Sequence, residues 1–254
     1  MTKTETSGGE AVVLHQFPFS HYNEKARWAL DFKGIPHQRK NYLPGPHAGP
    51  IEKLSGQSQT PVLSLGQRVV SGSAAILEAL EEAHQERPLL PSEPDLRADA
   101  QELQARFDEE LGPAVRTAVF SVMLDEPGYM CAMFSSPQPL PMRWIYRGVF
   151  PLAKGKVERA YRVREDDHVL ACREVVDRNL EEIENRVQST GYLVGDRFTV
   201  ADLTAASLLA PVADPDHIDM KRPEPQPESV RAFVAPWRGH PACDWVREMY
   251  RRHR

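Results

Sequence analysis

The start of the chain constrains the fold most strongly, because it combines a strand, a short loop and a helix. Val12-Val13-Leu14 is a short β-prone run, and a turn containing Pro18 follows it. A helical pattern then runs over residues 23–33 and ends at Gly34. This order predicts that Ser20 lies at the N-terminus of the first helix.

Ser20 has two interpretations at such a position. Serine is a preferred N-cap, so its hydroxyl can simply accept a hydrogen bond from the first turn of the helix. Alternatively, the unpaired N–H groups and the positive end of the helix dipole favour an anion there, and the hydroxyl can donate to a thiolate or a phosphate. The residues alone leave both interpretations open.

The rest of the first third continues as an alternation of strands and helices. Residues 38–42 predict a second strand, and a βαβ start favours a parallel pair with a right-handed crossover. Residues 60–65 and 67–70 flank Gly66 as a tight hairpin, and residues 73–83 form a compact helix. The predicted order β-α-β-α-β-β-α describes an α/β domain over residues 11–90.

The second part of the chain predicts helices only. Residues 87–94 contain three prolines and predict an interdomain linker, which leaves residues 95–254 for an all-helical domain. Its helices are expected within residues 95–119, 166–187, 192–209 and 229–250. The proline-rich residues 211–227 are expected to form a surface loop.

Residues 125–156 are predicted to be irregular, because five prolines and Gly128 interrupt them. Methionine and aromatic side chains are common there. Such adaptable side chains suit the wall of a pocket for apolar ligands of varied shape, and they equally suit the filling of a core between helices. Both interpretations stay open.

Composition excludes several classes of function. A formal charge of −5 offers no general attraction to nucleic acid, and no apolar run approaches the roughly 20 residues that span a bilayer. The polar residues 1–10 predict a frayed tail without a signal sequence, so we expect a cytoplasmic protein. Cys131, Cys172 and Cys243 are widely separated, which fits a reducing compartment and gives no metal-ligand spacing.

Residues 20–30, Ser-His-Tyr-Asn-Glu-Lys-Ala-Arg-Trp-Ala-Leu, together with this order of elements, resemble the cytosolic glutathione S-transferases. The resemblance implies a thioredoxin-like N-terminal domain followed by an all-helical C-terminal domain. Ser20 and Asn23 match two positions that are cysteines in redox relatives. Because Asn23 cannot form a disulfide, thiol–disulfide exchange by two cysteines is not expected.

Three loops extend the resemblance to a glutathione site. Gly45-Pro46-His47 is similar to a loop that approaches the glycyl carboxylate. Gln59-Thr60-Pro61 resembles a turn with a cis proline, whose preceding residue pairs its backbone with the cysteinyl part of glutathione. Ser71-Gly72-Ser73 resembles the motif that holds the γ-glutamyl carboxylate at a helix N-terminus.

The chain also departs from the family. Gly72 stands where the family usually has Glu or Gln, so one contact to the γ-glutamyl ammonium is missing unless another residue or a partner chain supplies it. His47 is a weaker cation at neutral pH than the lysine of related loops. In the second domain, residues 192–202 match the family's folding signature, and Thr199 with Asp202 has the spacing of a capping box.

The resemblance implies a glutathione S-transferase, with glutathione as co-substrate and no metal. Ser20 is expected to donate a hydrogen bond to the thiolate, which attacks an electrophilic, largely apolar substrate, as in detoxification. Tyr22 is the rival donor, and Asn23 is a further candidate. A glutathione-dependent isomerase or lyase, for example an ether-cleaving enzyme, and a non-catalytic ligand carrier are the alternatives. The family is usually a homodimer, so two chains are expected.

Overall fold

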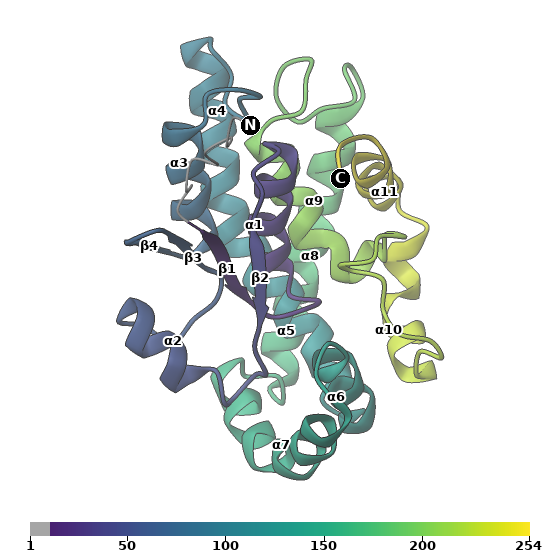
Figure 1. The fold of residues 1–254 in the computed structure, drawn as a ribbon. Helices are drawn as coiled ribbons and strands as arrows, with labels where there is room; N and C mark the ends of the chain where they lie inside the picture. The colour runs from purple at the N-terminus through teal and green to yellow at the C-terminus, as the bar shows by residue number, and fades with distance from the viewer. Residues whose placement is uncertain (1–10) are drawn as a thin grey trace, which may run out of the picture.

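The structure, a computed structural model, describes residues 11–254. The predicted frayed tail, residues 1–10, lies outside the described residues. An α/β layer comes first in the chain, and an assembly of helices follows it (Figure 1). This confirms the predicted fold class.

The α/β layer is built on a four-stranded mixed sheet. Its elements are β1 (Val12–Gln16), α1 (His21–Phe32), β2 (Gln38–Asn41), α2 (Ala48–Ser55), β3 (Val62–Leu65), β4 (Arg68–Ser71) and α3 (Ser73–Ala83). The strand order is β2-β1-β3-β4, in which β1 pairs parallel with β2 and antiparallel with β3. The register sets His15 of β1 opposite Val62, and Val62 opposite Ser71 of β4. The loops after β1, before β3 and after β4 therefore meet at one edge of the sheet.

The helical part begins with one long helical segment that contains a π-helical turn. It consists of α4 (Pro94–Arg106), η1 (Phe107–Leu111) and α5 (Gly112–Met123). The remaining helices are α6 (Pro127–Ser135), α7 (Leu140–Ala160), α8 (Asp166–Val187), α9 (Val200–Ala213), α10 (Glu228–Arg238) and α11 (Pro241–His253). The loop between α3 and α4 covers the predicted linker, whereas the division into domains 11–90 and 95–254 stays a prediction.

Two sequence predictions in this part are wrong. Residues 125–156 are not irregular, because Pro127 and Pro141 each stand in the first turn of a helix, where the missing N–H costs nothing. Pro151 lies inside α7 without ending it. The last predicted helix is two helices, since the chain turns at Gly239 and His240 before α11 starts at Pro241.

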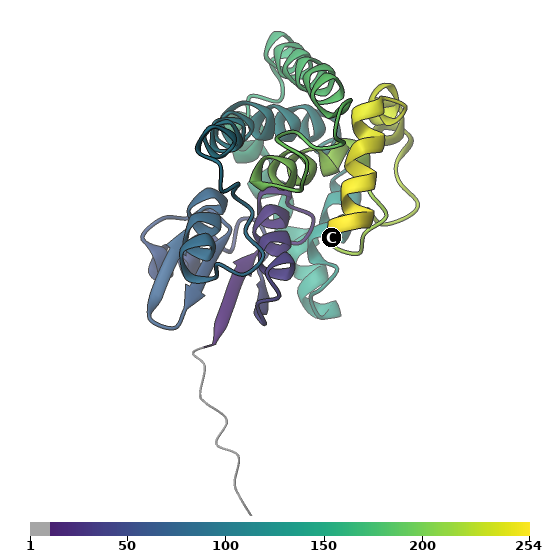
Figure 2. The same ribbon diagram turned by 90° about the horizontal axis from the view of Figure 1, so that it is seen from above.

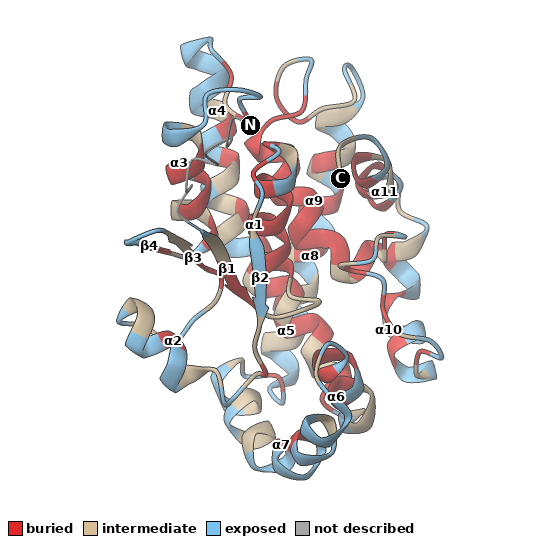
Figure 3. Cartoon of the chain, viewed as in Figure 1, coloured by how far each residue is buried: buried red, intermediate tan, exposed pale blue. Residues whose placement is uncertain are grey.

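Helix α9 is the centre of the core, and its thirteen buried residues cover all of its faces. It packs against α1 of the sheet layer and against α11 (Figures 1 and 3). Helix α1 is enclosed in the same way, since nine of its twelve residues are buried. The chain ends beside α1, where the Trp28 indole donates to the carbonyl of His253 (2.9 Å) (Figure 2). Both helices therefore join the sheet layer to the helical assembly.

None of the helices that the structure describes has the combination of length and apolar character needed to cross a membrane.

Candidate active site

Ser20 lies between β1 and α1 and is the N-cap residue of α1, as predicted. Its backbone is extended (φ −88°, ψ 124°), but its side chain makes no capping hydrogen bond. The preceding residue, Phe19, has φ +58°, a conformation that non-glycine residues rarely adopt and that is enriched at functional sites. The half-buried hydroxyl is therefore not used by the helix and can donate to a ligand.

The cis proline loop lies next to this helix start. The Thr60-Pro61 bond is cis, and the carbonyl of Pro61 accepts from the N–H of Gly72 (2.9 Å). In the part of the chain from residue 11 onward, the N–H and carbonyl of Thr60 have no hydrogen-bond partner. An unpaired backbone at the end of a strand is suited to pairing with an extended peptide.

Gln59, the neighbouring candidate, differs from Thr60. The side chain of Gln57 accepts from the N–H of Gln59 and donates to its carbonyl (3.0 Å). The backbone of Gln59 is therefore occupied, and Thr60 is the residue of this loop that is open to a ligand.

Asn23 connects α1 to the same loop. It is fully buried, and its amide donates to the hydroxyl of Thr60 (3.2 Å). Its side-chain oxygen is buried and has no partner among the described residues. Asn23 thus fixes the spacing between the helix start and the cis proline loop, and it leaves one acceptor unsatisfied.

Gly72 and Ser73 form the third part of the site. Gly72 has φ +90°, which a side chain would strain, and it is the N-cap residue of α3. Ser73 is the first residue of α3 and is 7% exposed. The first N–H groups of α3 have no partner within the helix, so this end can accept a carboxylate.

His47 is the N-cap residue of α2. Its Nδ1 accepts from the N–H of Gly45 (3.0 Å), and its ring packs edge-on against Phe17, with 4.6 Å between the centroids. Burial lowers the pKa of His47, and hydrogen bonds with the backbone of Ser58 and Leu43 act in the opposite direction. His47 is therefore neutral at pH 7, and its Nε2–H is a hydrogen-bond donor rather than a cation.

Tyr22, the alternative donor to a thiolate, is engaged elsewhere. Its hydroxyl donates to the carbonyl of Asp108 in the π-helical turn (2.7 Å). Burial raises the pKa of its phenol above the ordinary value. A Cβ at Gly112 would lie 2.2 Å from this hydroxyl, so Gly112 leaves the space that the phenol fills. Tyr22 therefore has a structural role, because it packs α1 against α5.

Sequence reasoning missed the charged residues of α1. Lys25 is fully buried and pairs with Asp108 (2.5 Å). Glu24 and Arg27 are also buried and pair with each other (2.7 Å). The i,i+3 pair of Glu24 and Arg27 is visible in the sequence, but it would normally lie on an exposed face. Burial of the helix cannot be recognised there, because Asp108, which pairs with Lys25, and Arg254, which also pairs with Glu24, lie far along the chain.

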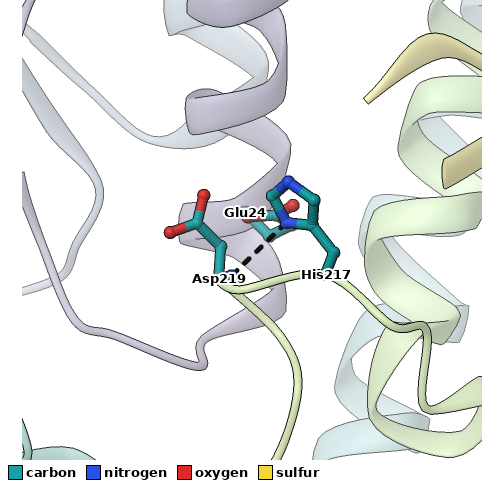
Figure 4. A group of neighbouring side chains, drawn as sticks. All are labelled: Glu24, His217 and Asp219. Atoms are coloured by element: carbon teal, nitrogen blue, oxygen red, sulfur yellow. Dashed lines mark hydrogen bonds between the residues drawn. The ribbon is translucent and has the colours of Figure 1, made fainter. Parts of the chain in front are cut away.

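Glu24, His217 and Asp219 come together behind α1 in a group that could hold a metal ion (Figure 4). Arginines already neutralise its carboxylates, because Arg254 reaches Glu24 (2.8 Å) and Asp219 (2.6 Å). Arg39 also pairs with Asp219 (2.8 Å). The pKa of His217 is lowered, mainly by burial and next by Arg254. This lowered pKa and the cationic partners fit an ion-pair network and not a metal centre.

Of the two interpretations of residues 125–156, core filling holds for part of the apolar side chains, whereas Met142 and Trp144 are exposed. The inner side chains of this segment are 2–6% exposed and fill the core between α6 and α7: Met130, Met133, Phe134, Tyr146 and Phe150. A cavity of about 160 Å³ lies beside Pro18 and Phe19, and its lining is largely polar, but Ser20, Thr60 and Ser73 do not line it. Gln16, Arg27, Arg39 and Asn41 line it together with Phe19.

Comparison with known protein families shows to which family the chain belongs. The family described as "Glutathione S-transferase, N-terminal domain" matches residues 14–88, and "Glutathione S-transferase, C-terminal domain" matches residues 138–226. The chain belongs to the glutathione S-transferase family. Thr199 and Asp202 form the capping box of α9 that their spacing predicted.

Individual relatives are distant. FtsZ-localized protein A of Caulobacter vibrioides is 27% identical over 202 residues, which cover 78% of this chain and 75% of the relative. The β-etherase LigF of Sphingobium sp. strain SYK-6 has the same fold, with a TM-score of 0.63 at 19% identity over 94% of this chain and 99% of LigF. A glutathione S-transferase of Methylobacterium radiotolerans, in complex with glutathione sulfonate, gives a TM-score of 0.56 at 20% identity over 93% and 94% of the two chains.

The donor set of this site fits glutathione, the substrate of the family. Thr60 offers an unpaired backbone to a peptide, Ser73 offers a helix start to a carboxylate, and Ser20 offers a hydroxyl to a sulfur.

Proposed function

We propose that the protein is a glutathione transferase in which Ser20 activates the thiol of bound glutathione. The observation that carries this proposal is the Ser20 hydroxyl, which lies at the start of α1 without a capping bond. Backbone groups of Thr60 would hold the cysteinyl part, and Ser73 the γ-glutamyl carboxylate. His47 would donate to the glycyl carboxylate as a neutral ring.

The energetic contributions of this arrangement are of the size that thiol activation requires. A free thiol has a pKa of about 8.5, so lowering it by two units requires roughly 2.7 kcal/mol of preferential stabilisation of the thiolate. One hydroxyl donor to a charged acceptor contributes about 1.5–3 kcal/mol. The dipole of α1 adds roughly 0.3–1 kcal/mol. The resulting thiolate would attack an electrophilic atom of the second substrate.

The β-etherase LigF shares the fold, so glutathione-dependent ether cleavage is the second candidate activity. A screen of aryl ethers against halogenated aromatic electrophiles separates the two reactions. A non-catalytic ligand carrier is the third candidate, and the missing contact at Gly72 supports it.

The test compares Ser20→Ala with Ser20→Thr, which keeps a hydroxyl. We expect Ser20→Ala to raise the pKa of the thiol of bound glutathione by one to two units. The ultraviolet absorbance of the thiolate measures this pKa. Turnover at pH 7 should fall by roughly 10- to 100-fold, while the calorimetric Kd for glutathione changes little. Full activity of Ser20→Ala would remove Ser20 from the mechanism, and no heat of binding with millimolar glutathione would support the carrier.

A further inference from the structure

Arg116 of α5 is a half-buried cation without a partner of opposite charge in the described chain. None of the ion pairs and hydrogen bonds among residues 11–254 involves its guanidinium, and its Nε is buried without an acceptor. Removing a charge from water without a counterion costs free energy, so proteins rarely leave an arginine in this state. Arg116 can therefore pair with an anion that comes from outside the chain.

Aromatic rings hold the guanidinium of Arg116 in place. Its Cζ lies 4.2 Å from the ring centroid of Tyr161 and 5.9 Å from that of Tyr22. Phe120, one turn further along α5, packs edge-on against Tyr161, with 5.8 Å between the centroids. Stacking covers the faces of a guanidinium and leaves its N–H groups, which lie in the plane, for hydrogen bonds. Because the three rings are only half-buried, a ligand can contact them as well.

This cation lies next to the start of α1. The Nε2 of His21, the residue after Ser20, is 3.1 Å from the carbonyl oxygen of Gly112. Gly112 lies one turn before Arg116 on α5. The charge of Arg116 is also the second cause, after burial, of the lowered pKa of His21. The positive charge of Arg116 therefore acts at the end of α1 where the proposed thiolate would form.

The carboxylates of the same region have other partners. Asp108, in the π-helical turn before α5, pairs with Lys25 (2.5 Å). Glu24, in the first turn of α1, pairs with Arg27 (2.7 Å). Neither carboxylate compensates the charge of Arg116.

We propose that Arg116 binds a carboxylate of the second substrate, so that the protein prefers electrophiles that carry a carboxylate to neutral ones. This inference rests on the proposed function, because it names the class of substrate that the thiolate at Ser20 attacks. A planar guanidinium matches a carboxylate with two parallel N–H···O bonds. The exposed parts of Phe120 and Tyr161 would pack against an aromatic or unsaturated body of the acid.

The first test measures binding, so it needs no turnover. The probes are a chloronitrobenzoate and the corresponding chloronitrobenzamide, which differ in charge and hardly in shape. Calorimetry follows each probe with the full chain in the presence of S-methylglutathione, whose blocked sulfur prevents reaction. We expect the wild type to bind the carboxylate at least about 10-fold more tightly than the amide. Arg116→Gln should abolish this preference, and Arg116→Lys should keep part of it, because lysine retains the charge and lacks the planar fork.

Arg173→Gln is the matched control. Arg173 of α8 is a half-buried guanidinium that also stacks on two rings, Phe233 (4.8 Å) and Trp237 (5.2 Å), but these lie in α10 and not at the start of α1. This variant should keep the full preference for the carboxylate, so a general loss of stability cannot imitate the expected result. A wild type without the preference, or a preference that survives Arg116→Gln, would overturn the inference.

The second test separates this inference from the proposed function. With glutathione, the thiolate sulfur bonds to the ring carbon of the probe and chloride leaves with the bonding electrons. We expect Arg116→Gln to lower kcat/KM for the benzoate by about 10-fold relative to the benzamide, whereas Ser20→Ala should lower both equally. Equal losses for both probes in Arg116→Gln would show that Arg116 acts on the thiolate, against the inference. If the wild type converts neither probe but calorimetry still shows the preference that depends on Arg116, the proposed function fails and the carboxylate site stands.

Discussion

Gly112→Ala tests the contact between the site helix and the helical assembly. In an ordinary helix, replacing glycine by alanine stabilises the protein by about 1 kcal/mol. At this position the new Cβ would lie 2.2 Å from the hydroxyl oxygen and 2.6 Å from Cζ of Tyr22. The phenol would have to move and would lose its bond to the carbonyl of Asp108.

The magnitude follows from these two effects. Overpacking costs about 1–3 kcal/mol and the lost hydrogen bond about 1 kcal/mol, so after the gain in helix propensity we expect a net loss of about 2 kcal/mol. For a chain of this size that corresponds to a fall in Tm of roughly 4–8 °C. Because Tyr22 lies two residues after Ser20, turnover should fall as well.

The assay is thermal and urea unfolding of the variant beside Gly128→Ala, whose Cβ would lie 3.8 Å from the Arg147 guanidinium, an ordinary contact. Gly128→Ala should be neutral or slightly stabilising. Adding Tyr22→Phe to Gly112→Ala should recover only part of the loss, because Cζ stays too close. A Gly112→Ala protein as stable as the wild type would refute the close packing of Tyr22 against α5.

The remaining predictions concern buried charge and pH. Burial, and to a smaller extent the charge of Arg116, lowers the pKa of His21 to about 3. Between pH 6.5 and pH 3, His21 therefore binds a proton in the unfolded chain but not in the folded chain. The free energy of unfolding should therefore fall as pH drops below 6.5, by up to about 1.4 kcal/mol per pH unit from His21 alone, and His21→Gln should reduce that slope in urea titrations. Asp108→Ala leaves the buried Lys25 ammonium without its carboxylate and should cost about 3–5 kcal/mol, whereas exposed Glu109→Ala should change stability by less than about 0.5 kcal/mol. Arg254→Ala removes the second cationic partner of buried Glu24, beside Arg27, and should lower Tm by several degrees in calorimetry, while exposed Arg251→Ala should not. Equal effects of the two arginine substitutions would show that the pairing of Arg254 with α1 adds nothing.

The sequence predicted those parts of the fold that local patterns determine. The helix over residues 166–187 and the capping box of α9 are confirmed, because periodicity and cap residues act within a few positions. The loops of the site also lie together, since their spacing follows from the order of strands. Their roles toward glutathione stay predictions.

The parts that failed depend on contacts between distant segments. The prolines of residues 125–156 indicated a break, although two of them start helices and Pro151 is accommodated in α7. The charges of α1 would normally predict an exposed face, but α9 and the chain end enclose this helix. Glu24 has one partner nearby in Arg27, but neither Asp108, the partner of Lys25, nor Arg254, the second partner of Glu24, can be recognised from the neighbouring sequence.

The most direct measurement is a crystal structure of the protein with glutathione. The account predicts that the sulfur lies within hydrogen-bond distance of the Ser20 hydroxyl, with the cysteinyl backbone paired to Thr60 and the γ-glutamyl carboxylate at the start of α3. A sulfur atom placed away from Ser20, or a groove that admits no tripeptide, would contradict it.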